Sequence, residues 1–193
     1  MYGVFKNYMD SKIEMSPEQS DWIRSLSVVK KIRKHQYLLN EGDVCTQHAF
    51  VTKGCLRSYF VDCDGKEHVV KFAVEHWWIA DRDSLLSGEP AKLNIDAVED
   101  SEVVLFSKQN FDLICQKISV FNDMVNNLLQ SAYNASQNRV LANISLSAGE
   151  KYEYFLQRYP NLAVRIPISM IASYLGISPE TLSRVRKQAV PKQ

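Results

Sequence analysis

Near the carboxyl end of the printed sequence, a glycine is followed by polar and cationic residues at spacings that suit contact with nucleic acid. In the stretch "SYLGISPETLSRVRKQ", the outward side of one helix would carry Glu180, Thr181, Arg184 and Lys187. Reading of base edges requires a few such side chains near the start of a helix that fits the major groove. This pattern indicates a DNA-reading helix, and the alternative is an ordinary helical hairpin with solvated charges.

The charge of this stretch differs from that of the whole chain. The 193 residues carry a formal net charge of only +1. Between residues 165 and 193 the cations are Arg165, Arg184, Arg186, Lys187 and Lys192, and the acid is Glu180. A local cationic surplus is sufficient to attract phosphates, so the near-neutral total charge does not exclude a nucleic-acid partner.

Two helices joined by a tight turn must position these side chains. Gly176 suits the turn, and Ala172, four residues earlier, would let the two helices cross closely. Ser178 can cap the second helix, and Pro179 suits its first turn. The apolar positions expected to face inward are Ile171, Leu175, Ile177, Leu182 and Val185. The spacing therefore predicts a helix–turn–helix.

The first half of the chain is predicted to be rich in β-strands. A helix is expected to begin at Ser16, where "SPEQ" offers a capping box with proline at the first helical position. From about Lys34 to Phe106, short apolar runs alternate with turn residues, and Asp64-Gly65 is a hairpin signal. Several short strands at this spacing predict an antiparallel sandwich or barrel.

A long helix is predicted from about Val120 to Ser145. Its apolar positions step by alternating fours and threes, which is the rhythm of a helix packed against a partner helix. These positions are Phe121, Val125, Leu128, Ala132 and Ala135. The partner is either the same helix of a second copy or the chain's own core.

Composition and motifs argue against several other classes of protein. With 46% hydrophobic and 23% charged residues, the chain should fold around a core. No apolar run suits a signal peptide or a membrane span, so a cytoplasmic protein without membrane contact is expected. We expect no metal, cofactor or enzyme activity, because the histidines lack ligand spacing and no nucleophile–base pair is evident. The four cysteines also lack a C-x-x-C pair: Cys45, Cys55, Cys63 and Cys115.

The order of these parts, with "LLNEGD", "VTKGCLRSYF", "DGKEHVVKF" and "IASYLGISPETLSRVRK", resembles the Crp/Fnr (cyclic-AMP receptor protein) family of bacterial transcription regulators. The resemblance implies an α+β fold with an antiparallel β-roll of the cyclic-nucleotide-binding jelly-roll type. It implies a β-roll effector domain with an N-terminal helix at 1–118, a long dimerisation helix at 119–145 and a helix–turn–helix domain at 146–193.

The resemblance also implies partners and residue roles. Members act as homodimers on palindromic double-stranded DNA, respond to a small-molecule effector and work with RNA polymerase. By this likeness Ser178 and Thr181 would hold phosphates, Glu180 would accept from cytosine N4 and Arg184 would donate to guanine O6 and N7. Pro179 stands where the family pattern has an arginine, so the half-site should differ from that of members with the arginine.

The segment that corresponds to the family's effector-binding motif departs from the pattern of members that bind cyclic nucleotides. Ile79-Ala80-Asp81 replaces the family's glycine–acid motif, and Leu93-Asn94 falls where an Arg-Ser pair is expected. Without the phosphate-neutralising arginine, and among many acids, cyclic-nucleotide binding is not expected. The candidate effector-binding residues are Trp77, Trp78, Arg82 and Asn94, and the alternative for the tryptophans is packing within the β-roll.

After the proposed reading helix the printed sequence continues only with "AVPKQ", where most members of the family have a two-stranded wing. We therefore expect a wingless DNA-binding domain. The leading hypothesis is a sequence-specific, effector-controlled transcription regulator. The alternative is a small-molecule sensing or protein-interaction module that has lost DNA binding.

Overall fold

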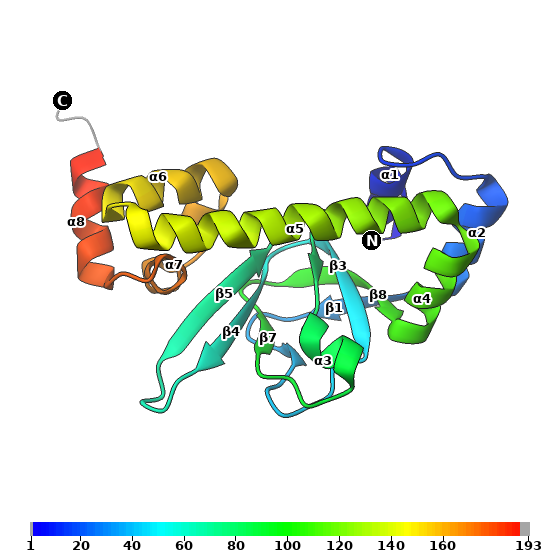
Figure 1. Ribbon diagram of the computed structural model, residues 1–193, viewed down its shortest axis with the longest axis horizontal. Helices are drawn as coiled ribbons and strands as arrows, with labels where there is room; N and C mark the ends of the chain where they lie inside the picture. The colour runs from blue at the N-terminus through cyan, green and yellow to red at the C-terminus, as the bar shows by residue number, and fades with distance from the viewer. Residues whose placement is uncertain (1, 190–193) are drawn as a thin grey trace. The chain divides into compact units, whose positions relative to one another are not determined.

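The computed structural model describes residues 2–189, with only the backbone described for Ala189. Contacts divide the chain into two compact units. Unit one contains Met1–Phe60 and Val70–Leu129, and unit two contains Val61–Val69 and Gln130–Gln193. Strands β4 (Leu56–Val61) and β5 (Glu67–Ala73) and the long helix α5 (Ser119–Ser145) each contribute residues to both units (Figure 1). None of the described helices is long and apolar enough to cross a membrane.

Two four-stranded antiparallel sheets form the β-rich body. The first has the order β1-β8-β3-β6, and the second has the order β2-β7-β4-β5. Apolar side chains between the sheets include Val51, Leu56, Ile95 and Val103, all at most 1% exposed. The strands are β1 Val28–Ile32, β2 Tyr37–Leu39, β3 Gln47–Lys53, β4 Leu56–Val61, β5 Glu67–Ala73, β6 Trp78–Ile79, β7 Asn94–Ala97 and β8 Ser101–Ser107. The α+β class expected from the sequence is confirmed.

Helices cover a second core cluster in unit one. Phe5, Phe50, Phe106, Phe111 and Phe121 meet there, drawn from helices and strands far apart in the chain. The predicted capping box at Ser16 is present, because its hydroxyl accepts from the Gln19 N–H and its own N–H donates to the Gln19 side chain. The helices are α1 Tyr2–Asp10, α2 Pro17–Ser25, α3 Arg82–Ser87, α4 Lys108–Lys117 and the first part of α5 Ser119–Ser145.

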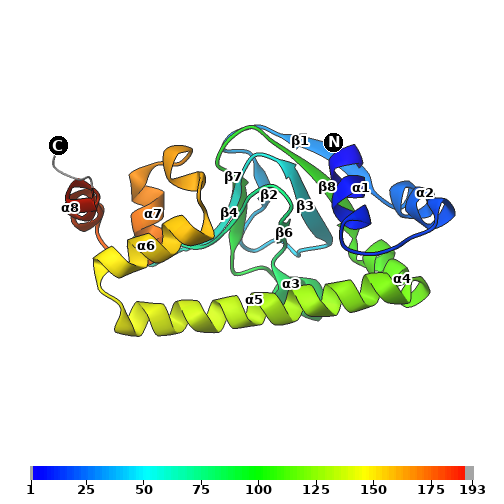
Figure 2. The same cartoon turned by 90° about the horizontal axis from the view of Figure 1, so that it is seen from above.

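The long helix α5 is uninterrupted over its 27 residues (Figure 2). The first part of its predicted apolar stripe packs on the chain's own core, since Phe121 is fully buried and Val125 and Leu128 pack against the same cluster. A second apolar stripe, shifted around the helix, is exposed at Tyr133 and Ile144 and at Val140 between them. The first stripe is therefore covered by the core of unit one, whereas the second is exposed to solvent.

Unit two is mainly helical. Its core is built from aromatic and aliphatic side chains that include Phe155, Leu162, Ile171 and Leu182, each at most 1% exposed. A capping box formed by Ser147 and Glu150 starts the first helix after α5. The elements are the second part of α5, α6 Ala148–Arg158, the 3-10 turn η1 Leu162–Val164, α7 Ile168–Leu175, α8 Pro179–Ala189 and the hairpin residues Val61–Val69.

Candidate nucleic-acid interface

The turn between α7 and α8 has the geometry predicted from Gly176. This glycine lies in the left-handed region, with φ 66° and ψ 33°. Its N–H donates to the Ser173 carbonyl at 3.2 Å, and the Ile177 N–H donates to the Ala172 carbonyl at 3.1 Å. These two bonds close the end of α7 in the Schellman arrangement, which favours glycine because a side chain is strained at positive φ. The predicted helix–turn–helix is present.

The apolar residues expected to face inward hold α7 and α8 together. Ile171 and Leu182 are fully buried, and Leu175 is nearly so. Ile177 and Val185 are half-buried. Because one side of each helix is fixed in this way, the opposite side of α8 is left to solvent.

A short polar network begins α8. The Ser178 hydroxyl accepts from the Thr181 N–H at 3.1 Å and lies 3.1 Å from the Thr181 hydroxyl. The Arg184 guanidinium donates to the Thr181 hydroxyl at 3.4 Å. Ser178 therefore acts as the helix cap, and three of the predicted DNA-contacting residues lie together in the first two turns.

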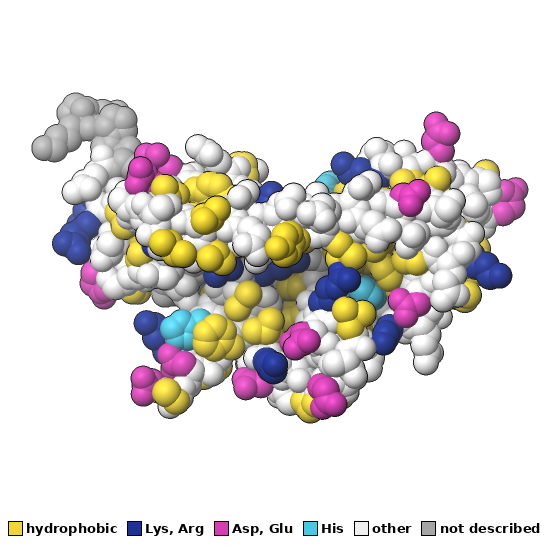
Figure 3. Space-filling model, in the orientation of Figure 1, with side chains coloured by type: hydrophobic (Ala, Val, Ile, Leu, Met, Phe, Trp, Pro, Cys, Tyr) yellow, Lys and Arg dark blue, Asp and Glu magenta, His cyan; other side chains and the backbone are white. Residues whose placement is uncertain are grey.

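The exposed side of α8 is cationic. Arg184, Arg186 and Lys187 are exposed, and Figure 3 shows basic side chains at the surface over this helix. Glu180 has a pKa below its usual value, because its own backbone N–H and Ser178 donate to the carboxylate and Arg184 adds attraction. At neutral pH Glu180 is thus an acceptor. The predicted cation Lys192 lies outside the described residues.

The four candidate effector residues do not line one common site. Trp77 packs against the cluster between the sheets, whereas Trp78 packs edge-on against Phe50 and Phe111 in the helical cluster. Arg82 is exposed on α3. The Asn94 side chain accepts from the Glu41 N–H at 2.9 Å, so its amide oxygen is already engaged.

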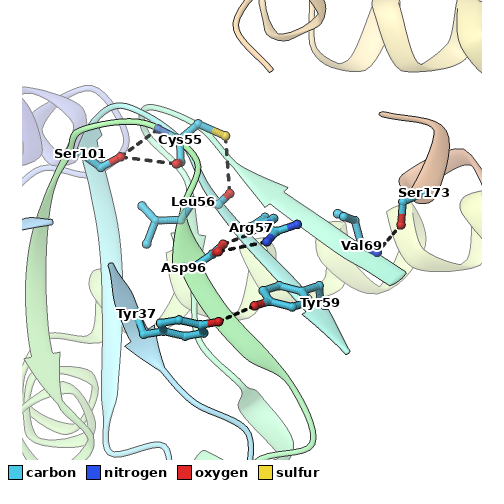
Figure 4. Close-up of polar contacts among 9 residues, drawn as sticks. All are labelled: Tyr37, Cys55, Leu56, Arg57, Tyr59, Val69, Asp96, Ser101 and Ser173. Atoms are coloured by element: carbon cyan, nitrogen blue, oxygen red, sulfur yellow. Dashed lines mark hydrogen bonds and ion pairs between the residues drawn. The ribbon is translucent and has the colours of Figure 1, made fainter. Parts of the chain in front are cut away.

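The burial of Arg57 on the second sheet was not predicted from the sequence. Arg57 on β4 binds Asp96 on β7 with Nε–Oδ1 and Nη2–Oδ2 distances of 2.8 and 3.1 Å (Figure 4). The guanidinium also lies 4.0 Å from the centre of the Tyr59 ring, and the Tyr59 hydroxyl lies 2.9 Å from that of Tyr37. Burial, together with this hydrogen bond and Asp96, raises the pKa of Tyr59. An arginine within the apolar run "LRSYFV" was the signal available in the sequence.

A small cavity of about 290 Å³ in unit one was also not foreseen. Apolar side chains such as Leu38, Val44 and Ile79 share its wall with the polar residues Asp43, Thr46 and Gln47. Cys45 lies in the same wall, and burial raises the pKa of its thiol, which keeps it neutral.

Comparisons with known proteins agree with this architecture. Residues 29–118 match the family model of the cyclic nucleotide-binding domain. No curated protein sequence matches the chain. Among solved structures, FixK2 from Bradyrhizobium japonicum is similar with a TM-score of 0.73 and 20% identity, over 84% of this chain and 83% of that one.

Two further structures are similar over most of their length. The c-di-GMP-responsive global regulator CLP from Xanthomonas campestris has a TM-score of 0.72 at 12% identity, over 90% of this chain and 91% of that one. A transcriptional regulator of the crp/fnr family from Eubacterium rectale has a TM-score of 0.70 at 17% identity, over 94% and 87%. Residues 29–118 are therefore similar to the cyclic nucleotide-binding domain, and the chain has the fold of the solved Crp/Fnr-family regulators.

Proposed function

We propose that this chain is a sequence-specific DNA-binding transcription regulator that reads the major groove with α8. The observation that carries the proposal is the exposed cationic side of α8, held on a helix–turn–helix by Gly176 and a buried apolar seam. Helices presented in this way fit the major groove of B-DNA. The shared fold with solved regulators supports the same function.

Within this proposal, the residues predicted to contact DNA have distinct roles. Arg184 donates to guanine O6 and N7, and Glu180, ionised at neutral pH, accepts from cytosine N4. Lys187, one turn beyond Arg184, attracts a phosphate. Ser178 and Thr181 contact phosphates through their hydroxyls, which share one hydrogen bond with each other.

We further propose that the regulator acts as a homodimer and works with RNA polymerase. The exposed stripe of α5 at Tyr133, Val140 and Ile144 supports a helix-to-helix contact between two copies. A two-fold dimer presents two copies of α8, so the operator should be palindromic, with half-site centres about 34 Å apart.

Selection of bound duplexes from a random pool by the full chain tests the DNA-binding proposal. We expect enrichment of a site with two inverted half-sites, each containing a G·C pair that is lost from the preferred site when Arg184→Ala is selected in the same way. If no sequence is enriched even at low salt, DNA binding by this chain is contradicted, and a sensing or interaction module becomes the better account.

We propose that the effector is a small molecule other than cyclic AMP or cyclic GMP. Leu93 stands where a phosphate-binding arginine is expected, and the Asn94 amide oxygen accepts from Glu41. Of the nearby cations, Lys92 is 3.6 Å from Asp83 on the surface and Arg82 is exposed. Calorimetry with cyclic AMP and cyclic GMP should show no saturable heat at micromolar concentrations. Saturable binding would contradict the proposal that the effector is not a cyclic nucleotide.

A further inference from the structure

In the part of the chain that the structure describes, strand β5 is the last strand of the second sheet, so one of its edges has no neighbouring strand. Two side chains from helices of unit two bind this edge. One is Ser173 on α7, the first helix of the helix–turn–helix, and the other is Arg139 on α5. Figure 4 shows Ser173 facing the Val69 backbone.

The Ser173 hydroxyl uses both of its hydrogen-bonding capacities on β5. It donates to the Glu67 carbonyl at 2.8 Å and accepts from the Val69 N–H at 2.9 Å. These two groups belong to residues i and i+2, which present their backbone on the same edge of a strand. A single hydroxyl thus replaces part of a neighbouring strand.

Arg139 adds a third contact to the same short segment. Its Nη2 donates to the Val69 carbonyl at 3.3 Å. Its guanidinium lies 4.4 Å from the centre of the Tyr174 ring, directly beside Ser173 in the chain. Tyr174 in turn packs against Phe155 in the core of unit two, with ring centres 5.7 Å apart. The arginine is therefore held where it can bind the strand.

We propose that these residues form a clasp, defined as Ser173 and Arg139 with the Glu67 and Val69 backbone, that positions the DNA-reading helices. All four residues belong to unit two, and β5 continues directly into Val70–Ala73 of unit one. Within unit two, the clasp therefore links α7 and α5 through the backbone of one short strand segment. The inference rests on the proposed DNA-binding function and adds a regulatory element to it.

The clasp assists DNA binding and does not block it. While it is formed, Arg184 and Lys187 on α8 are exposed. Loss of the clasp would leave α7 and α8 free to take other orientations, and only a fraction of molecules would then present both reading helices at the operator spacing. Apparent affinity falls in proportion to the binding-competent fraction. An effector that shifts β5 would change DNA affinity through the same contact.

Ser173→Ala removes the hydroxyl and leaves the backbone of α7 unchanged. We expect faster hydrogen exchange at the Val69 amide, and DNA binding about three- to tenfold weaker, the range of one or two hydrogen bonds. Binding should also tolerate half-site spacings that the wild type rejects. Ser173→Thr, which retains a hydroxyl, should restore both readouts, and Ser131→Ala, at an exposed serine of α5, should change neither.

The outcomes separate the clasp from the proposed function. If the wild type binds its selected operator and Ser173→Ala binds it with equal affinity and equal spacing preference, the positioning role is wrong. Tighter binding by Ser173→Ala would also overturn it, because the clasp would then be inhibitory. If the wild type binds no DNA, the proposed function fails, and this inference fails with it.

Discussion

At the scale of single residues, the buried Arg57 side chain forms an ion pair with Asp96 inside the β-rich body. The side chains of Arg57 and Asp96 are each only 5% exposed, and they pair in a bidentate geometry. Breaking a buried pair costs more than replacing it, because the remaining charge has no partner in a medium of low dielectric. This pair therefore makes the second sheet sensitive to single substitutions.

We expect Asp96→Ala to lower the free energy of unfolding by about 3–5 kcal/mol, because it leaves the Arg57 guanidinium buried without its carboxylate. The double variant Arg57→Met with Asp96→Leu should recover most of that loss. Urea denaturation of the three proteins measures both changes. A loss below about 1 kcal/mol in Asp96→Ala would show that the pair contributes little.

Residue-scale prediction from sequence succeeded where the signal is local. Gly176 and Ser178 act on their own turn and helix end, so their roles could be predicted from the adjacent residues. The Arg57–Asp96 pair joins two strands that are distant in the chain, and the Ser173 contact with Val69 spans a still longer separation. Only the register of the folded strands brings such residues together.

At the scale of elements, α2 and the turn before α8 carry their own start and stop signals, whereas α1 does not. Tyr2–Asp10 is held by burial of Phe5 and Met9 against the aromatic cluster of unit one. No capping pattern marks this helix in the sequence, and it was missed. The apolar stripe of α5 was predicted, but its division between the chain's own core and solvent depends on the fold.

The exposed stripe of α5 predicts the effect of charge on dimerisation. Val140→Asp with Ile144→Asp should convert dimers to monomers at micromolar concentration, because two carboxylates would be buried at the helix-to-helix contact. Light scattering measures the mass. Leu86→Asp, at an equally apolar exposed residue on α3, is the matched control and should remain dimeric.

A monomeric wild type would contradict the dimer proposal. Leu128 is a poorer test site, although it lies in the stripe predicted from the sequence. Its side chain packs against the core cluster of unit one, so Leu128→Asp should lower stability as well as alter association.

His48 on β3 predicts a loss of stability in mild acid. Its ring stacks on Phe111 with centres 3.9 Å apart, and burial lowers its pKa to about 4 from 6.5. The unfolded chain then binds a proton below about pH 6.5 that the native protein rejects until about pH 4, so stability falls as pH falls through this window. The free energy of unfolding should fall by about 2–3 kcal/mol over this window. The value is below that expected from the full pKa difference because the His48 ring is partly accessible to solvent.

Urea denaturation at pH 7.5 and pH 4.5 tests this titration in the wild type and in His48→Gln. The variant should lose less stability than the wild type between the two pH values, because glutamine does not titrate. An equal loss in both proteins would place the acid sensitivity on other groups.

At the scale of the whole molecule, the chain combines a β-rich body, most of which matches the cyclic nucleotide-binding domain model, with a helix–turn–helix whose second helix is cationic. The order of these parts could be predicted from the sequence because each has a distinct hydrophobic period. The cavity of about 290 Å³ could not be predicted, because its wall brings together residues of β2, β3, β6 and β7 and of the segment before β3.

A salt-titrated series of affinities, on the selected operator and on a scrambled duplex, tests the central claim most directly. Arg184→Ala should weaken the free energy of binding to the operator by about 1–3 kcal/mol and affect the scrambled duplex much less, because it removes a base contact. Lys187→Ala should weaken binding to both duplexes alike, because it removes a phosphate contact. The slope of log affinity against log salt concentration should become smaller by about one per monomer. If neither substitution changes binding, α8 is not the DNA-reading surface and the account is contradicted.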